Sequence, residues 1–258
     1  MHFESRVAWS DGMFLRAQHF QQADRWTEHL VRTTVDKLSP YPWGMLEVEI
    51  DHGALTDGHF ALYRLRGILP DGTPFDAPAN TALPAPLTLN EQIQDTIIYL
   101  ALPVRQPGRA DVATQDAQAN TVRLITTTYD APDTNADTDS TAPVSVAQLK
   151  LRLLKTGDDL SGYAVMGLAR ISEVRSDKAV ILDQTYLMPS LNCTAAPKIL
   201  SLVTELLGIV RHRFQAIAAR LSNSTARSTP NIGDYVLLHA LNRSDPLLAH
   251  ISANASRI

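Results

Sequence analysis

The stretch Thr96–Val104, which reads TIIYLALPV, decides the fold class of this chain. Residues 97–102 are hydrophobic at every position, so a strand formed by them would bury both faces, as a central strand of a sheet does. The stretch Leu149–Leu153, by contrast, alternates leucine with a basic residue. That alternation predicts a strand with one face in water. We therefore expect strands to organise the middle of the chain.

Short strand patterns continue from Met45 to about Asp183, and turn residues separate them. The turns include Thr56–Gly58, Pro70–Gly72 and Lys155–Gly157, each of which ends in glycine. Many short strands without intervening helices predict an antiparallel β-sandwich rather than a parallel sheet. Besides Thr96–Val104, the predicted strands are Met45–Ile50, His59–Arg66, Thr121–Tyr129, Val144–Lys155, Tyr163–Val174 and Ala179–Leu182.

Helical patterns flank this β region. A first helix is predicted from about Arg16 to Leu38, and Pro40 and Pro42 end it because proline disfavours helical geometry in the residue before it. Its hydrophobic residues share one face at helical spacing. They are Phe20, Ala23, Leu30, Val31, Val35 and Leu38, with Trp26 toward the edge of the stripe.

A second hydrophobic stripe predicts a helix late in the chain, since its members are spaced by three or four residues. They are Ile199, Val203, Leu206, Val210, Phe214, Ile217 and Leu221. A further helix begins near Ile232, and we expect Pro246 to kink or restart it, with Ser244 or Asp245 as a cap. The predicted fold class is therefore mainly β with α: an antiparallel β-sandwich followed by a helical-bundle segment.

Two polar insertions interrupt the strand patterns, at Gln106–Asn120 and at Asp130–Pro143. Both are rich in Asp, Thr, Ala, Asn, Gln and Pro. Such segments bury too little hydrophobic surface to offset the entropy lost on ordering, so we interpret both as mobile loops.

The composition is that of a globular protein without an obvious electrostatic partner. The net charge of −4 and the isoelectric point near 6.0 give no reason to expect nucleic acid or an anionic membrane as a ligand. A single cysteine, Cys193, excludes an internal disulfide and suits a reducing compartment. The charged N-terminus lacks a signal peptide's apolar core, and no run reaches the roughly 18 apolar residues of a membrane span. We expect a cytoplasmic protein without membrane insertion.

Motifs for catalysis, phosphate binding or metal binding are absent from the sequence: no Gly-x-Ser-x-Gly, P-loop, His-Glu-x-x-His or Cys-x-x-Cys occurs. His19 and His29 lie about 280° apart on a helix and form no metal pair. The segment Asp133–Asp139 resembles a calcium loop but lacks glycine at its sixth position, Thr138, and a glutamate where Val144 stands. We therefore predict no cofactor, no metal and no enzymatic activity.

A stretch at the start of the chain, Trp9–Trp26, reads WSDGMFLRAQHFQQADRW and leads into the first predicted helix. It resembles the opening of the TssK family of type VI secretion baseplate subunits, also called ImpJ or VasE. Members of that family carry a Trp-x-x-Gly-Met-x-Leu-x-Pro-Gln-x-Phe-Gln-Gln run near the N-terminus. This chain matches the run at every defined position except Ala17, where many members carry proline.

Similarity to the family continues along nearly the whole chain. The matching segments are Pro42–Gly44, Leu69–Asp76, Leu102–Pro103, Leu149–Leu153, Met188–Leu191 and Leu238–Arg243. TssK-like proteins consist of an N-terminal β-sandwich shell, which resembles the shoulder of phage receptor-binding proteins, a helical neck and a C-terminal head. The resemblance implies that residues 1–188 form the shell with its leading helix and that residues 189–258 begin the neck. The head is absent from this sequence, and residues 252–258 do not resemble the family's continuation.

The resemblance also implies a function. TssK-like proteins form homotrimers, attach through the shell to the wedge proteins TssF and TssG, and contact the inner-membrane components TssL and TssM through the head. We therefore expect a structural baseplate component, recruited to the inner-membrane-associated secretion complex, whose contact with TssL and TssM would need the absent head. Its wedge-binding candidates are Trp9, Gly12, Met13, Phe14 and Leu15, and its oligomerisation candidates are the seven residues of the stripe from Ile199 to Leu221.

Other interpretations stay open at the level of the sequence. The segment Trp9–Leu15 could cover the sandwich edge of its own chain, and the Ile199–Leu221 stripe could be an intramolecular core. The phage-like sandwich suggests a carbohydrate- or receptor-binding module as an alternative, which would need exposed aromatic residues beside Asp, Asn or Gln. An enzyme is the third hypothesis, and no catalytic set of residues supports it.

Overall fold

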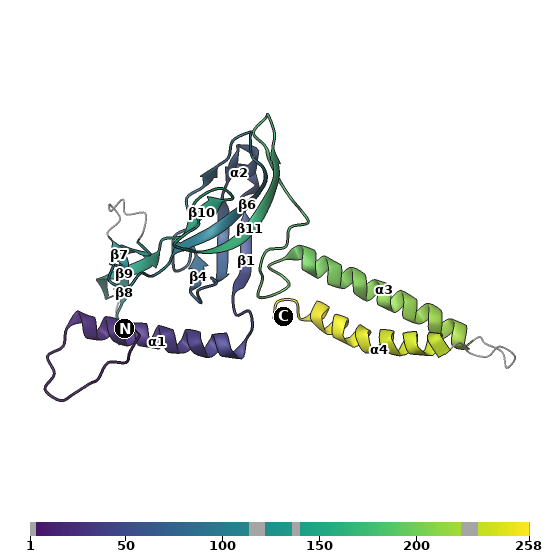
Figure 1. The fold of residues 1–258 in the computed structure, drawn as a ribbon, viewed down its shortest axis with the longest axis horizontal. Coiled ribbons are helices and arrows are strands. Elements are labelled where there is room, and N and C mark those ends of the chain that lie inside the picture. Colours follow the sequence, from purple (N-terminus) through teal and green to yellow (C-terminus); the bar gives the residue numbers. More distant parts are fainter. Residues whose placement is uncertain (1–3, 114–121, 136–139, 223–231, 258) are drawn as a thin grey trace.

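A β-sandwich forms the centre of the molecule, one long helix lies below it, and a pair of helices extends away from it (Figure 1). The computed structural model describes residues 4–113, 122–135, 140–222 and 232–257. The first helix, α1 (Ala17–Leu38), has the predicted bounds to within one residue. The predicted antiparallel sandwich is confirmed.

Two antiparallel sheets make the sandwich. One contains β1 (Gly44–Ile50), β3 (Leu62–Ile68) and β4 (Pro74–Ala77) in that order. The other has the order β10 (Arg152–Lys155), β6 (Gln94–Pro103), β11 (Tyr163–Val174) and β12 (Val180–Leu182). The strand predicted to be central, β6, does pair on both sides, with β10 and β11.

Side chains of both sheets meet in one hydrophobic core. Leu65 and Phe75 come from the first sheet, and Ile98, Leu100 and Ile171 come from the second; all are at most 2% exposed. The uninterrupted apolar run of β6 agrees with its burial, since every residue of the run is buried or partly buried. The strand therefore exposes neither face fully to water.

Smaller elements were missed or merged by the sequence prediction. The short helix α2 (His52–Thr56) begins where the Asp51 carboxylate accepts a hydrogen bond from the Ala54 amide at 3.0 Å. The predicted strand His59–Arg66 is two strands in different sheets, since β2 (His59–Phe60) pairs with β5 (Leu87–Thr88) and β3 pairs with β1. The predicted strand Val144–Lys155 is also divided, between β9 (Thr141–Leu149) and β10.

A third sheet stands beside the sandwich and corrects the prediction of two loops. It contains β7 (Val112–Ala113), β8 (Leu124–Pro132) and β9, and β7 pairs with β8 in parallel. The predicted loop Gln106–Asn120 therefore contains a strand, and the predicted loop Asp130–Pro143 contributes paired residues at both of its ends. Polarity alone misled the prediction, because a ladder of backbone hydrogen bonds does not require hydrophobic side chains. Residues 114–121 and 136–139 lie outside the described part of the chain.

The helices α3 (Pro197–Ser222) and α4 (Ile232–Ala253) run side by side in opposite directions (Figure 1). The helix α4 begins at the predicted residue and continues through Pro246, so the prediction of a restart there was wrong. Ion pairs join the two helices, with Arg211 Nε 2.8 Å from Asp245 Oδ1 and Arg220 Nη2 3.5 Å from Asp234 Oδ1.

The connection into α3 is fixed to the first sheet. The Met45 amide donates to the Pro189 carbonyl at 2.9 Å, and the Leu191 amide donates to the Met45 carbonyl at 2.8 Å. Gly44, at φ +146°, permits this approach, because a Cβ on it would lie 3.0 Å from the backbone of Ser190. Two segments far apart in the sequence, Pro42–Gly44 and Met188–Leu191, thus meet at one joint.

Candidate functional site

The N-terminal segment Trp9–Leu15, which we call the hook, lies on α1. The Trp9 ring centroid is 6.3 Å from that of His19 and 6.5 Å from that of Phe20. Phe14 is 83% exposed, and Trp9 and Leu15 are about half exposed. Met13 is partly buried, and Gly12 has a φ of +73° that favours glycine. The hook therefore contacts its own leading helix, and its largest side chains remain in water.

His19 caps the N-terminus of α1, although in the sequence it stood out only as one of two histidines too far apart around the helix to bind a metal. The Arg16 amide donates to His19 Nδ1 at 3.0 Å, and the His19 amide donates to the Arg16 carbonyl at 3.0 Å. Side chain and backbone thus satisfy amide groups that the first turn of a helix leaves free. A capping pattern in which histidine occupies the third helical position could have indicated this role.

The polar side of α1, rather than its hydrophobic side, faces the sandwich. Glu28 Oε2 lies 2.7 Å from Nη1 of Arg105, which follows β6. Arg32 packs along the turn before β4, where a Cβ at Gly72 would lie 2.9 Å from Arg32 Cγ. At 3.6 residues per turn these two side chains point about 80° and 120° away from Phe20. The helix is therefore attached to the sandwich by charged side chains.

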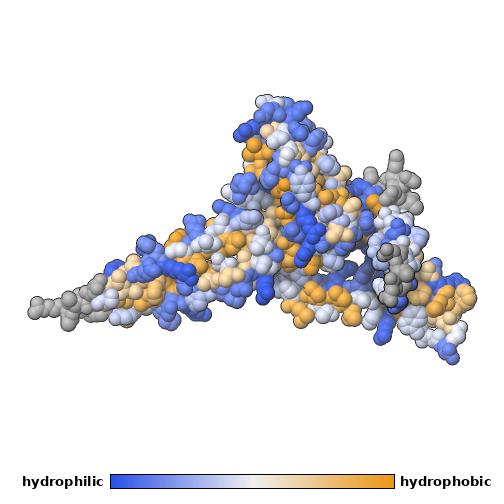
Figure 2. All heavy atoms as spheres, turned by 180° about the vertical axis from the view of Figure 1, so that it is seen from behind, coloured by the Kyte–Doolittle hydropathy of each residue, from blue (hydrophilic) through white to orange (hydrophobic). Residues whose placement is uncertain are grey.

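The hydrophobic stripe of α1 is consequently exposed. No residue of the helix is buried, and Leu38 is 81% exposed. The others of its large members, Phe20, Leu30, Val31 and Val35, are each at least 40% exposed. Figure 2, which shows the molecule from behind, has hydrophobic surface where α1 lies, along the lower edge toward the right. Single exposed hydrophobic residues are ordinary, whereas contiguous exposed hydrophobic patches are typical of interaction surfaces.

Ion pairs near the attachment of α1 hold several segments together. Arg105 also places its Nε 2.8 Å from Asp111 Oδ2. Burial would lower the pKa of Arg105, but its hydrogen bond to Glu28 and the charges of both carboxylates raise that pKa above its ordinary value. Arg105 therefore stays charged and connects α1, the end of β6 and the segment before β7.

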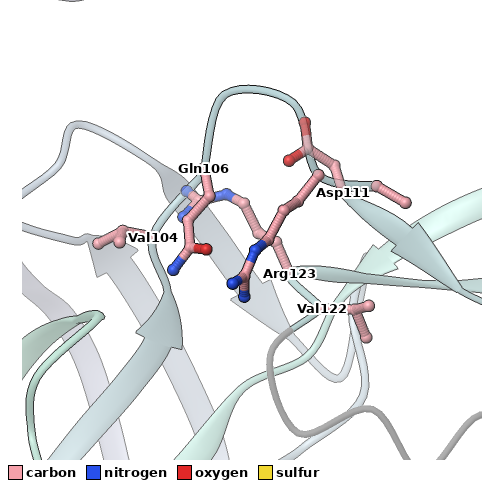
Figure 3. Close-up of a pocket in the computed structure, with 7 residues that line it drawn as sticks. Val104, Gln106, Asp111, Val122 and Arg123 are labelled. Carbon is pink, nitrogen blue, oxygen red and sulfur yellow. The ribbon is translucent and has the colours of Figure 1, made fainter.

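Arg123 makes a second, more buried junction beside a small cavity of about 230 Å³ (Figure 3). Its guanidinium donates to the Pro103 carbonyl at 2.7 Å, to Asp71 Oδ2 at 2.8 Å and to the Thr73 hydroxyl. The side chain of Arg123 is only 8% exposed. Arg123 thus holds the β3–β4 turn, the end of β6 and the start of β8 together.

Asp71 is the carboxylate of this junction. Burial would raise the pKa of Asp71, but the Arg123 charge and hydrogen bonds from Thr73 and Arg123 outweigh it and lower that pKa below its ordinary value. Asp71 belongs to the segment Leu69–Asp76, one of the segments whose sequence resembles the family. Its partner Arg123 was not singled out, because the two residues are distant in the sequence.

A shallow hollow lies beside β1, β3 and α2. The exposed Tyr63 lines it, and the Tyr63 hydroxyl is hydrogen-bonded to Asp51, which raises the pKa of Tyr63. Asp51 is at the same time the cap of α2. An aromatic residue beside an acid is thus present, but both groups are already occupied within the chain.

The stripe on α3 is divided between the helix pair and the surface. Ile217 is 2% exposed, and Leu206 is 49% exposed. The other predicted oligomerisation residues, Ile199, Val203, Val210, Phe214 and Leu221, are partly buried. Leu202 and Ile209 lie one turn on either side of Leu206 and are also exposed. Packing against α4 explains part of the stripe, and one row of apolar side chains on α3 is left in contact with water.

The described residues form neither a candidate metal cluster nor a candidate membrane span. Among the described residues, no group of three or more His, Cys, Asp or Glu side chains could hold a metal ion. No helix in the same ranges combines the length and hydropathy required to cross a bilayer.

Comparisons with known proteins identify relatives along nearly the whole chain. The model of the bacterial type VI secretion family that includes EvfL, ImpJ and VasE matches residues 19–257. A curated protein of Pseudomonas aeruginosa, the type VI secretion system baseplate component TssK1, is 41% identical over 252 residues. That alignment covers 98% of this chain and 57% of the relative, so the chain spans little more than half the length of the curated protein.

Solved structures with the same fold are described as TssK. A crystal structure of TssK has a TM-score of 0.89 and 31% sequence identity, over 96% of this chain and 56% of that chain. A chain in the cryo-electron microscopy structure of a TssK–TssF–TssG baseplate subcomplex has a TM-score of 0.85 at 23% identity, over 98% of this chain and 81% of that chain. The second match supports the fold alone.

Proposed function

This chain belongs to the bacterial type VI secretion family that includes ImpJ and VasE, and we propose that it is a structural, non-enzymatic component of the secretion baseplate. The observation that carries the proposal is its 41% identity, over 98% of its length, to a protein named as the baseplate component TssK1. Asp111 and Arg123 beside the cavity support it, because both are engaged in ion pairs that hold chain segments together.

We propose that its partners are the wedge proteins TssF and TssG and two further copies of itself. A TssK chain of the same fold occurs in a complex with TssF and TssG, which supports the first part. Exposed apolar side chains on α3 support the second. In this assignment the sandwich with α1 is the shell and α3 with α4 is the start of the neck. The chain would act on the cytoplasmic side of the inner membrane, and contact with TssL and TssM would belong to the family's head.

The surface proposed for the wedge is the hook together with the exposed stripe of α1. Two features of the chain support this choice. The hook concentrates large hydrophobic side chains in water, and α1 directs its own hydrophobic stripe away from the sandwich. Covering both with a partner would remove apolar surface from water, which is the main driving force of protein association.

The test replaces Trp9 and Phe14 together by alanine and measures co-purification with the cognate TssF–TssG pair. Aromatic residues that fill a partner's pocket cost on the order of 2 kcal/mol or more each when truncated. The double variant should therefore lose most of the wedge protein from the purified complex. Tyr41→Ala is the matched control, because it removes an equally exposed aromatic side chain outside the hook.

Thermal unfolding of the double variant distinguishes the alternatives. An almost unchanged melting temperature with loss of TssF and TssG supports the proposal, since the hook contributes little to the core. Normal folding with full retention of the wedge would exclude the hook as its binding element. A large drop in the melting temperature would show that the hook stabilises its own chain.

A further inference from the structure

The outer strand of the third sheet, β9, has one edge without a partner among the described residues. Two backbone bonds fix how its residues alternate. Asp133 donates to the Ser140 carbonyl and Lys150 donates to the Arg123 carbonyl, both at 2.9 Å. In an antiparallel ladder, hydrogen-bonded and non-hydrogen-bonded pairs alternate. In the observed register, the even-numbered residues of β9 therefore bond to β8, and the odd-numbered ones direct their N–H and C=O groups outward.

One outward group is missing at Pro143 and one is occupied at Leu149, and the groups between these two residues are open. Pro143 has no N–H to offer, which agrees with its outward position, because proline is tolerated only there. At the other end, the Leu149 carbonyl accepts a hydrogen bond from the Thr81 hydroxyl at 2.9 Å. Ser145 and Ala147 lie between them, and both are exposed. Each therefore presents a backbone donor and a backbone acceptor to water.

The strand also lacks the residues that normally protect a sheet edge. β9 carries no charged side chain, and β8 carries only Asp130. Natural edges are usually protected by lysine, by other charges or by covering segments. Tyr129 and Val144, a directly opposite pair on one face of the hairpin, are both exposed hydrophobic residues. Such an edge is suited to pairing with another strand that carries no charged side chains.

We propose that the strand covering this edge is β9 of a second copy of the chain, paired antiparallel so that Ser145 lies opposite Ala147 of the other copy. In this register the N–H and C=O groups of Ser145 and Ala147 bond reciprocally, so the four backbone groups that these two residues direct outward are satisfied in each copy. The register also places Pro143 opposite Leu149 of the other copy. Pro143, which has no N–H, thus lies opposite the Leu149 carbonyl, which already accepts a hydrogen bond from the Thr81 hydroxyl. These two positions of the edge match each other, which is the self-complementarity that a two-fold contact requires.

This contact is distinct from the proposed trimer, because a strand paired with its own copy obeys two-fold symmetry. It would join two chains, or two trimers, through the third sheet. Val146 lies on the two-fold axis and faces Val146 of the other copy in a non-hydrogen-bonded pair. Cα atoms in such pairs are about 4.5 Å apart, which is within the range that a disulfide can bridge.

Cysteine cross-linking of the full chain tests the register. In a Cys193→Ser background, Val146→Cys should form a covalent dimer under mild oxidation. Val144→Cys is the matched control, because it lies on the same face of the strand and is more exposed. In the proposed register the two copies of residue 144 are four residues apart along the strand, or about 13 Å, which no disulfide spans.

Adding Ser145→Pro to the Val146→Cys variant removes two of the outward N–H groups of the dimer while leaving the bonds to β8 intact. It should slow cross-linking by about tenfold or more, whereas Ser145→Ala should leave the rate unchanged. Equal cross-linking at residues 144 and 146 would overturn the proposal, and so would no cross-linking at either residue. Insensitivity to Ser145→Pro would do the same. Because the readout is a bond at residue 146, it does not depend on TssF, TssG or the helices.

Discussion

Outside the hydrophobic core, single charged residues connect chain segments that are distant in the sequence. Arg123 is the clearest case, because its guanidinium contacts three segments that are remote from one another in the sequence. A buried guanidinium is costly unless it is hydrogen-bonded, and the Pro103 carbonyl, the Asp71 carboxylate and the Thr73 hydroxyl each accept a hydrogen bond from it here. The cavity beside it in Figure 3 is therefore the surroundings of a structural junction.

Asp71→Asn should lower the free energy of unfolding at neutral pH by about 1 to 3 kcal/mol, because Arg123 loses its charged partner. The pKa of Asp71 is lowered in the folded state. Its contribution to stability is thus fully present above the unfolded-state value near 3.9 and is lost as the pH falls through the lower folded pKa. Denaturant unfolding of both proteins at several pH values measures this.

The difference between the two proteins should be largest at neutral pH and should shrink in acid. Asp36→Asn, an exposed residue of α1, is the control and should change the stability by less than about 0.5 kcal/mol at any pH. A gap between wild type and Asp71→Asn that stays constant down to acid pH would contradict the role assigned to the carboxylate.

At the scale of elements, α1 is a helix whose attachment is polar and whose exposed side is hydrophobic. The Glu28–Arg105 pair is partly exposed, so it supplies a preferred position rather than much stability. The contacts of the N-terminal segment add to it, since Gln22 donates to the Ser5 carbonyl at 2.6 Å and the Arg6 guanidinium lies 4.9 Å from the Trp26 ring. Such a helix is well placed to keep its apolar stripe available to a partner.

Glu28→Gln should loosen α1 with little effect on the sandwich. The lost ion pair accounts for about 0.5 kcal/mol, which is small for global stability but a large share of a weak attachment. Hydrogen exchange should therefore become faster in α1 while the amides of β6 and β11 keep their protection. Asp24→Asn is the control on the same helix. Unchanged exchange in α1, or equal acceleration in the sandwich, would show that the pair does not hold the helix.

At the scale of the whole molecule, residues beyond the predicted shell boundary at 188 contact the sandwich. The backbone of residues 189–191 bonds to Met45, and Ala195 belongs to the sandwich core. We therefore propose a boundary between the two domains at about Ala196, just before α3 begins, in place of residue 188.

Two truncations of the chain test this boundary. A chain of residues 1–196 should keep the melting temperature that the sandwich has in the full chain. It should self-associate less, because it lacks α3 and α4. A chain of residues 1–188 should melt several degrees lower, since it loses the bonds to Met45 and the buried Ala195. Calorimetry and sedimentation measure both effects. Equal melting temperatures for the two truncations would return the boundary to residue 188.

Local pattern was sufficient to determine several elements from the sequence. The bounds of α1, the central position of β6, the start of α4 and the antiparallel sandwich follow from hydrophobic period and turn residues, which act over a few neighbouring positions. The motifs near Trp9 and Gly44 were sufficient to identify the family. A helix or strand is fixed largely by its own residues, so these predictions did not require knowledge of distant contacts.

Only the tertiary structure decided what depends on pairs that are distant in the sequence. An amphipathic helix ordinarily buries its stripe, yet Glu28 and Arg32 direct the polar side of α1 to the sandwich. The third sheet contains residues 124–129 and 144–149, which were predicted as strands, but it also includes β7 and the paired ends of the β8–β9 hairpin, which were predicted to be loops. Backbone pairing there depends on a partner strand rather than on hydrophobicity. The outward alternation of Ser145 and Ala147 depends on the register with β8. Orientation and register are properties of pairs of segments, and no single stretch of sequence contains them.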